Sequence, residues 1–225
     1  MRLIFSLTTI VFASLVGCST PVPTSVPSHT GPTVQGARCC EPSRHKPSRN
    51  DIVRTAAKLV GATTIQVNGR RIAYDCAGVT RAIFLAHGID LYDSEWHDPK
   101  ANGVRLIHSH IRHHGTFHDG PAVQPGDLVF FDNTWDYNGD GIINDPLTHV
   151  GIVERQEADG TIVFISRVAN AIERYRMNLG LPHVHLSAEG NVLNDYLRRK
   201  DRNDPVNASY LTGQLFAGFG TRAGF

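Results

Sequence analysis

The sequence YDCAGVTRAIFLAHG (residues 74–88) decides how the folded part of this chain is organised. Apolar residues recur at helical spacing after Cys76, and Gly88 can end the helix. Asp75 is well suited to cap the helix N-terminus, because its carboxylate can accept a hydrogen bond from the first turn. This stretch therefore predicts a helix that carries Cys76 in its first turn.

Helices are expected early in the chain and strands after them. Two further helical patterns cover residues 50–60 and 103–114. Strand patterns follow at residues 127–131, 148–154, 161–165 and 174–179. Helices first and strands later indicate an α+β fold with an antiparallel sheet. A turn-rich linker is expected at 62–73, and a loop-rich tail from Gly180 is expected to end in a short helix near 212–219.

The first 17 residues, MRLIFSLTTIVFASLVG, have one positive charge and a short apolar run that ends in small residues. This pattern is typical of a secretory signal peptide, and the run is too short to span a membrane. Leu15 to Cys18 resemble a bacterial lipobox. The resemblance implies that Cys18 becomes the lipidated N-terminus and anchors the protein in the cell envelope. Because Ser19 follows Cys18, we expect the outer membrane, facing the periplasm.

Residues 18–49 are dense in Pro, Ser and Thr and contain almost no large apolar residue. Such a segment cannot bury enough surface to fold, so we expect an extended, disordered tether. Cys39 and Cys40 lie in it, as spare thiols or in an intermolecular disulfide. Residues 50–225 then form one folded domain. The formal net charge of +1 gives no electrostatic reason to expect nucleic acid as a partner.

A cysteine at a helix start and a histidine on a strand are the placements that a thiol hydrolase needs. The partial positive charge of a helix N-terminus stabilises a thiolate, and a strand mounts the base rigidly. Cys76 and His149 fit these placements. On spacing alone, a buried structural cysteine is an equally good interpretation of Cys76.

Three ordered segments narrow this choice: DCAGV at 75–79, PGDLVFF at 125–131 and HVGIV at 149–153. Together they resemble the NlpC-type cell-wall peptidases, relatives of the CHAP amidases in the papain-like cysteine peptidase superfamily. The resemblance implies a papain-like α+β fold, with Cys76 as the nucleophile and His149 as the general base. It also implies hydrolysis of an amide bond in the peptidoglycan stem peptide, commonly after D-glutamate, through a thioester.

The resemblance further implies a third polar residue, often histidine, on the strand after His149. Ser166 stands at that place, and Asn170 is the alternative. Serine orients an imidazole less well than histidine does, so two other functions stay open. One is a catalytically weak or inactive domain that binds the cell wall. The other is a related acyl hydrolase or transferase that acts on a non-wall substrate.

Three more residues near these motifs are candidates for orienting groups or substrate contacts. Asp75 directly precedes the nucleophile. Tyr74 stands close to the position of a tyrosine that is usual in the family, but at a different offset. Arg167 follows Ser166 and could meet a substrate carboxylate.

The segment DYNGDGIIND (136–145) resembles the start of a calcium-binding loop. Oxygen-bearing side chains occupy positions one, three and five, glycine occupies position six, and position seven would offer a backbone carbonyl. Position twelve is a leucine, so an acid at position ten would have to replace the usual one. The candidate ligands are Asp136, Asn138, Asp140, Ile142 and Asp145. The alternative is a polar surface loop, and no other cofactor is expected.

Histidines are dense at residues 108–114. Apart from Asp119, no cysteine or acid could complete a compact set of zinc ligands, so we expect a solvated helix face.

Overall fold

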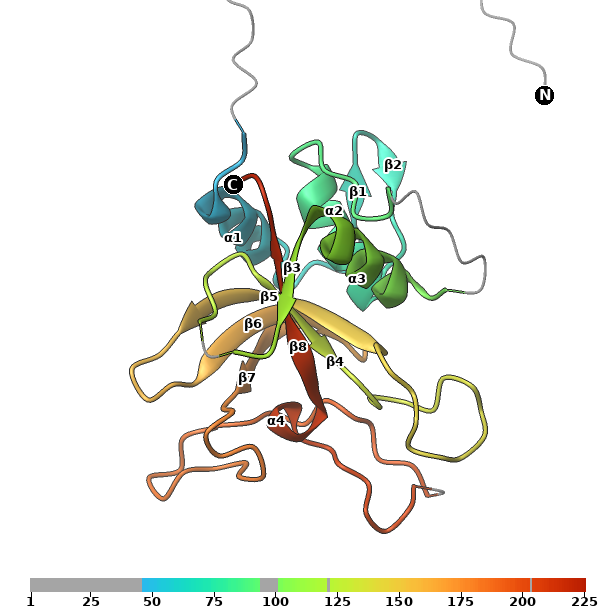
Figure 1. Cartoon of the computed structure of the whole chain (residues 1–225), viewed down its shortest axis with the longest axis vertical. Helices are drawn as coiled ribbons and strands as arrows, with labels where there is room; N and C mark the ends of the chain where they lie inside the picture. The colour runs from blue at the N-terminus through green and yellow to red at the C-terminus, as the bar shows by residue number, and fades with distance from the viewer. Residues whose placement is uncertain (1–45, 94–100, 121, 203) are drawn as a thin grey trace, which may run out of the picture. The chain divides into compact units, whose positions relative to one another are not determined.

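The computed structural model describes residues 46–93, 101–120, 122–202 and 204–225, and within them helices pack on an antiparallel sheet (Figure 1). The helices are α1 (Arg49–Lys58), α2 (Cys76–Leu85), α3 (Gly103–His114) and α4 (Thr212–Leu215). A short hairpin is formed by β1 (Gln66–Val67) and β2 (Arg70–Arg71). The main sheet contains β3 (Gly115–His118), β4 (Leu128–Phe131), β5 (His149–Gln156), β6 (Ile162–Val168), β7 (Ala171–Met177) and β8 (Phe216–Arg222).

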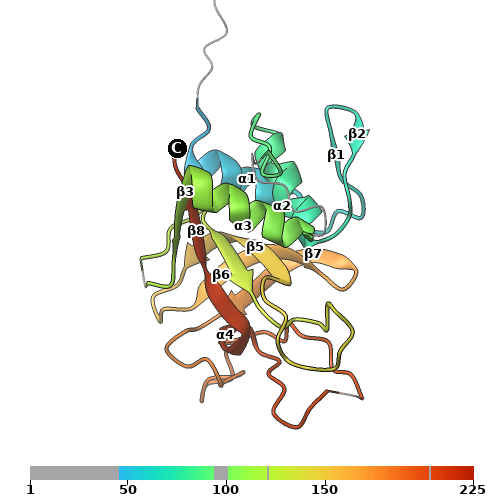
Figure 2. The same cartoon turned by 45° about the vertical axis from the view of Figure 1, so that its right-hand side comes forward.

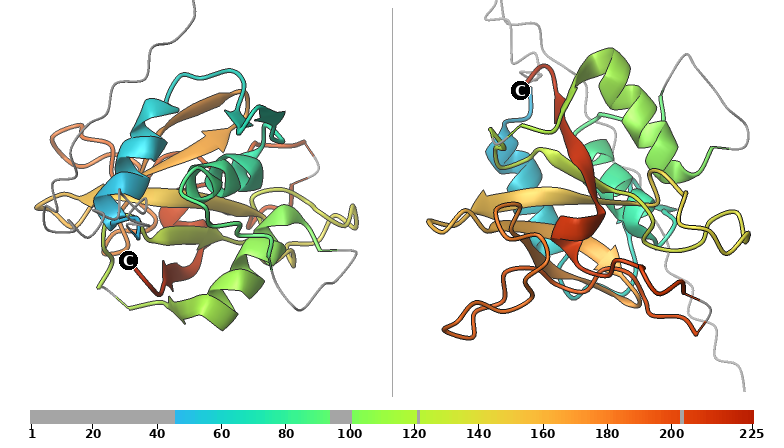
Figure 3. Two further views of the ribbon diagram at one scale, coloured as in Figure 1. Left: turned by 90° about the horizontal axis from the view of Figure 1, so that it is seen from above. Right: turned by 60° about the horizontal axis from the view of Figure 1, so that its bottom comes forward.

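The main sheet has the order β3-β8-β4-β5-β6-β7, and every neighbouring pair in it is antiparallel. Helices α1, α2 and α3 cover one face, as the view from above shows (Figure 3). The segments 178–202 and 204–211, together with α4, run along the other face (Figures 1 and 2). Each face therefore has its own apolar layer. The α+β class is confirmed, with N-terminal helices packed on an antiparallel sheet.

Helix α2 lies in the centre of the helical layer because most of its surface is apolar. Its residues from Ala77 to Thr80 and from Ala82 to Phe84 are buried. Its start is fixed by Asp75, whose side chain accepts a hydrogen bond of 2.7 Å from the backbone N–H of Gly78. A Cβ atom at position 78 would lie 2.0 Å from the carbonyl oxygen of Ala73, so only glycine fits there. These contacts fix the backbone that presents Cys76.

Asp127, the acidic residue of the PGDLVFF segment, connects the sheet to α1 through an ion pair with Arg49. Its carboxylate is almost fully buried and lies 2.6 Å from Nη1 of Arg49. It also accepts hydrogen bonds from the backbone N–H of Gln124 and the hydroxyl of Thr221. A buried carboxylate needs such partners, since an unpaired charge in the interior is costly. Asp127 therefore joins α1, β4 and β8.

The sequence predicted most of these elements within a few residues, and α3 matches its expected range. The expectation of a linker at 62–73 was wrong in part, because β1 and β2 pair there across Asn68 and Gly69. Both turn residues have positive φ, 51° and 74°, as a tight two-residue hairpin turn requires. The fourth strand extends over Ala171–Met177 rather than 174–179.

The expected terminal helix near 212–219 was also wrong beyond Leu215. Residues from Phe216 onward form β8, which pairs with β3 on one side and β4 on the other. Two glycines of this strand face the aromatic rings of Phe117 and Phe130, where a Cβ atom would come within 3.0 Å of a ring atom. Pairing on both edges, rather than local helix propensity, determines the structure of this segment.

The predicted signal peptide, Cys18 and most of the tether lie outside the described residues. In the part of the chain that the structure describes, no helix combines the length and the apolar character needed to cross a bilayer.

Candidate active site

Cys76 and His149 line one cavity of about 860 Å³. Cys76 is the first residue of α2, and His149 is the first residue of β5. The backbone of Val150, the residue that follows His149, lowers the pKa of the Cys76 thiol. Helix α2 and strand β5 are in contact, which brings the helix start and the strand start to one cavity.

The environment of Cys76 favours the neutral thiol in the resting state. Burial raises the pKa of this thiol to about 11, and the nearby charge of Asp75 acts in the same direction. Hydrogen bonds from the backbone N–H groups of Val150 and Ala77 oppose this shift because they stabilise the thiolate. The sulfur therefore keeps its proton unless a nearby base accepts it.

His149 is held by Ser166, and this contact sets which ring nitrogen carries the proton. The hydroxyl oxygen of Ser166 lies 2.8 Å from Nε2 of His149 and 2.7 Å from the carbonyl oxygen of Val150. A carbonyl can only accept, so the single hydroxyl proton is donated to Val150. The Ser166 oxygen must then accept from Nε2–H. Consequently Nδ1 is unprotonated, which is the state that a general base requires.

The same burial keeps the imidazole uncharged. Desolvation lowers the pKa of His149 to about 3, and the positive charge of Arg167 contributes to this shift. The resting pair is therefore a thiol and a neutral imidazole rather than an ion pair. In this state the imidazole is able to accept a proton from the thiol.

Gly151 allows β6 to approach the histidine closely. A Cβ atom at this position would lie 2.6 Å from the Phe164 ring and 3.2 Å from Cβ of Ser166. A larger residue would push β6 away and break the contact between Ser166 and His149. The glycine of the HVGIV segment is thus required by the geometry of the site.

The other candidates differ in what they contact. Asn170 lines the cavity and is exposed, but Ser166 is the residue that contacts the histidine ring. The hydroxyl of Tyr74 donates to the carbonyl of Ala62 at 2.5 Å, and its ring faces the guanidinium of Arg167. Asp75 and Arg167 both line the cavity.

Sequence reasoning missed most of one wall of the cavity, which is lined by Tyr196, Leu197, Arg198 and Arg199 from the long segment between β7 and α4. Trp135, from the loop between β4 and β5, completes this wall; its sequence suggested either a groove-lining residue or an ordinary core residue. Arg198 ties these two loops together, because it donates to the carbonyl of Asn133 and pairs with Asp204. No local pattern marks these residues, since their position depends on how the tail crosses the sheet.

The candidate calcium loop is folded around its own acids. The carboxylate of Asp136 accepts hydrogen bonds from the N–H groups of Gly139 and Gly141, at 2.7 and 2.8 Å. Asp140 accepts from the N–H of Ile142 at 2.8 Å. Asp145 is buried nearby. Among the described residues, no three His, Cys, Asp or Glu side chains are grouped so that they could hold a metal. Calcium at this loop stays a prediction.

If calcium binds this loop, a chelator is expected to lower the melting temperature by several degrees. A ligand at a hundred times its Kd adds about 2.7 kcal/mol to the free energy of unfolding. Asp140→Asn removes a charged ligand but keeps the side-chain shape, so it should abolish the chelator effect. Differential scanning calorimetry with and without calcium measures both. An identical melting temperature in calcium and in chelator would exclude the site.

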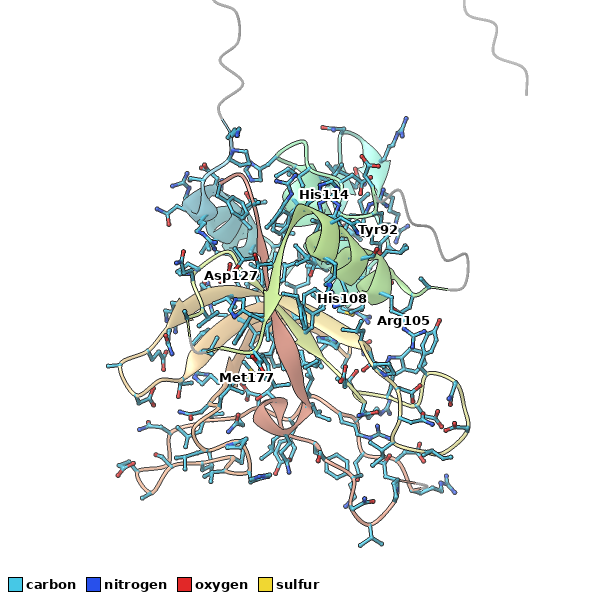
Figure 4. All side chains as sticks on the ribbon, in the orientation of Figure 1. Tyr92, Arg105, His108, His114, Asp127 and Met177 are labelled. Carbon is cyan, nitrogen blue, oxygen red and sulfur yellow. The ribbon has the colours of Figure 1, made fainter. Side chains whose placement is uncertain are left out.

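The histidine-rich helix is a solvated face only in part: Arg112, His113 and His114 are exposed, but two other histidines pack inward. His110 is buried, and its Nδ1 lies 2.8 Å from the carbonyl oxygen of Asp93. His108 packs edge-on against Phe117 and Phe130, between α3 and the sheet (Figure 4). Two of these histidines therefore belong to the packing between α3 and the strands.

Comparison with models of known protein families gives no match. The chain is 24% identical over 132 residues to a gamma-D-glutamyl-L-lysine dipeptidyl-peptidase of Bacillus cereus; the match covers 59% of this chain and 33% of the relative. The chain thus spans about a third of the length of that protein. It is also similar to the crystal structure of the P60 domain from an antigen of M. avium subspecies paratuberculosis, with a TM-score of 0.35 and 12% identity, over 56% of this chain and 82% of that domain. The chain therefore shows distant similarity to a dipeptidyl-peptidase over 59% of its length.

Proposed function

We propose that this protein is a cysteine-dependent amide hydrolase that cuts the stem peptide of peptidoglycan. The observation that carries the proposal is the geometry of the cavity. Cys76 at a helix start and His149 on the adjacent strand share it, and Ser166 leaves Nδ1 of His149 free to accept a proton. The distant similarity to a gamma-D-glutamyl-L-lysine dipeptidyl-peptidase supports the choice of substrate.

In the proposed mechanism, the thiol of Cys76 gives its proton to Nδ1 of His149 as the sulfur attacks the amide carbonyl. The backbone N–H of Cys76, at the positive end of α2, is suited to stabilise the tetrahedral oxyanion. When the intermediate collapses, His149 returns the proton to the leaving amine and a thioester remains. Water then attacks the thioester, and His149 again accepts the proton.

The second candidate is a domain that binds the cell wall without cutting it. Two observations favour it: a serine rather than a histidine contacts His149, and burial disfavours the thiolate at Cys76. A domain of this kind would be retained by peptidoglycan and would release nothing from it.

Cys76→Ala is expected to abolish the release of stem-peptide fragments from purified peptidoglycan, because no other group can form the thioester. Liquid chromatography with mass spectrometry measures the fragments. Cys40→Ala removes a thiol of the predicted tether and is the matched control, expected to act as the unmodified protein does. Equal release from both variants would refute cysteine catalysis. Retention of the unmodified protein on peptidoglycan without any release would favour the binding domain.

We also propose that the protein is lipid-anchored through Cys18 in the bacterial cell envelope, at the outer membrane and facing the periplasm. This would place the hydrolase next to peptidoglycan. Cys18→Ala is expected to move the protein from the membrane fraction to the soluble fraction and to prevent incorporation of labelled palmitate. Cys39→Ala serves as the control and should leave both properties unchanged. Membrane association of Cys18→Ala equal to that of the control would contradict the anchor.

A further inference from the structure

A second cavity, of about 460 Å³, lies along α3 and is lined by neither Cys76 nor His149. The described residues that line it, which we call the α3 cavity, include four basic side chains and no acid. They are Arg105, His108, Arg112 and His113, together with Ala101, Leu106, Ser109 and Leu147. A cavity of this size can hold a small ligand or one group of a larger one. Its lining suits a ligand that has an apolar body and a negative charge.

Three of the basic groups project from one side of the helix. Arg105, His108 and Arg112 follow each other at spacings of three and four residues, and the first two are seen on α3 in Figure 4. Burial lowers the pKa of His108 and the nearby charge of Arg112 adds to this effect, while Asp132 opposes it less strongly. The ring of His108 packs edge-on against two phenylalanines, and its nitrogens form no hydrogen bond with the described residues. A neutral imidazole of this kind still has an N–H to donate.

The charges of Arg105 and Arg112 are not neutralised within the described part of the chain. Neither arginine takes part in the ion pairs formed there. The guanidinium carbon of Arg105 lies 5.1 Å from the centre of the Tyr137 ring, and its Nη2 lies 3.5 Å from the carbonyl oxygen of Pro146. These contacts position the side chain but leave its positive charge in place. An anion is the ligand that two such arginines favour.

The α3 cavity adjoins the cavity of the candidate active site. Ala101 lines the first and Asn102 lines the second, and Leu147 and Thr148 are divided in the same way. The side chain of Asn102 connects these two pieces of backbone, because it donates a hydrogen bond of 3.2 Å to the carbonyl oxygen of Leu147. The two cavities therefore lie on opposite sides of one wall.

Aromatic side chains connect the two cavities at the surface. Trp135 lines the active-site cavity, and the centre of its ring lies 5.2 Å from that of Tyr137. Tyr137 in turn contacts the guanidinium of Arg105, which lines the α3 cavity. Half of the Trp135 surface is exposed (51%), so a bound molecule can contact it. A polymer held at Cys76 thus has a path over these two rings to the basic side of α3.

We propose that the α3 cavity is a second binding site for the wall polymer, which holds a free peptide carboxylate remote from the amide that Cys76 attacks. This inference rests on the proposed function and extends it to a separate cavity. Arg105 and Arg112 pair with the carboxylate, and His108 donates a hydrogen bond to it. Because these groups do not touch the reacting atoms, they bind the ground state and the transition state equally. Their loss therefore acts on KM rather than on kcat.

Calorimetric titration of the Cys76→Ala variant with two synthetic stem tetrapeptides tests this site without hydrolysis. One peptide keeps its carboxylates, and in the other each carboxylate is converted to a carboxamide. We expect the carboxylate peptide to bind more tightly. Adding Arg112→Gln to Cys76→Ala is expected to weaken binding of the carboxylate peptide about tenfold, the size of one lost charge-assisted hydrogen bond. The same substitution should leave binding of the carboxamide peptide unchanged.

Two further variants make this measurement specific. Arg112→Lys keeps the positive charge and should retain most of the affinity for the carboxylate peptide. Arg71→Gln removes an exposed arginine of β2 that lines neither cavity, and should have no effect. Unchanged binding in Arg112→Gln, or an equal loss in Arg71→Gln, would overturn the proposal.

Nuclear magnetic resonance of the histidine rings locates the bound peptide. The ring signals of His108 are expected to shift during the titration, whereas those of His183, which is exposed in the segment after β7, should stay fixed. A titration that leaves the His108 signals in place would contradict the site.

Vesicles of phosphatidylglycerol test the other anionic partner that a basic cavity could meet. Co-sedimentation of the Cys76→Ala variant with these vesicles should not depend on Arg112. If Arg112→Gln weakens binding to the vesicles and not to the carboxylate peptide, the cavity binds a membrane surface and the proposal fails.

Failure of the proposed function can be separated from failure of this inference. Undiminished fragment release by Cys76→Ala would refute cysteine catalysis, but the binding measurements would still decide whether the α3 cavity holds a peptide carboxylate. For an active hydrolase, Arg112→Gln should raise KM for the carboxylate peptide about tenfold, the same factor as the loss of binding. A loss confined to kcat would overturn the assignment of Arg112 to a remote binding site.

Discussion

His149→Ala is expected to reduce fragment release from peptidoglycan to the level of Cys76→Ala. The two side chains are expected to act as one unit, because desolvation raises the pKa of the Cys76 thiol to about 11 and the thiol keeps its proton unless the imidazole accepts it. Combining both substitutions should therefore cause no further loss. A double variant that is markedly slower than either single variant would show that the two residues act independently.

Ser166→Ala is expected to retain weak activity, slower by roughly a hundredfold, which is the usual cost of a slightly misplaced catalytic group. The ring of His149 would lose the acceptor that holds Nε2–H and could expose either nitrogen to the thiol. Ser166→Thr keeps the hydroxyl and should recover much of the rate. Full activity in Ser166→Ala would mean that the hydroxyl does not orient His149. Steady-state kinetics on soluble wall fragments measures these differences.

Mild acid is expected to destabilise the protein through His149. Its pKa in the folded state is about 3, below the ordinary value of 6.5, so the unfolded state binds a proton that the folded state excludes. Above pH 6.5 His149 is neutral in both states and does not lower the free energy of unfolding. As the pH falls from 6.5 towards 3, the free energy of unfolding decreases steadily because only the unfolded state takes up the proton. Between pH 6.5 and 5, this single group should lower the free energy of unfolding by about 2 kcal/mol.

Urea unfolding at several pH values isolates this effect when the protein is compared with His149→Gln. Burial also lowers the pKa values of His108 and His110, so these residues add losses of the same sign in both proteins. The free energy of unfolding is plotted against pH for each protein, and the difference between the two slopes is the contribution of His149. Equal slopes in the two proteins would mean that His149 titrates normally.

The sequence predicted the elements whose signals are local. Asp75 could be assigned as a cap because capping depends on a few neighbouring residues, and the chain indeed forms that hydrogen bond. Strands β4, β5 and β6 are short apolar runs between turn residues, and they lie close to where they were expected. Cys76 and His149 could be singled out because ordered motifs surround them, and the fold brings them to one cavity.

Long-range arrangements could not be predicted in this way. The glycine-rich strand β8 has no clear period, and its structure depends on partners 85 to 107 residues earlier in the chain (216 − 131 = 85 and 222 − 115 = 107). Arg198 reaches the cavity because the tail crosses the sheet, which no nearby residue signals. The sequence left Ser166 and Asn170 as alternatives, since only the geometry shows which of them contacts the ring.

The position of β8 has a consequence for the order of events during synthesis. Strands β3 and β4 are not neighbours in the sheet, because β8 lies between them and pairs with both. A ribosome makes β3 and β4 long before residues 216–222, so the growing chain has a gap in its sheet until that last strand emerges. Asp127 also lacks the hydroxyl of Thr221 until then. The sheet that carries His149 is therefore completed late, and a chain exported in an unfolded state would acquire its finished cavity only after translocation.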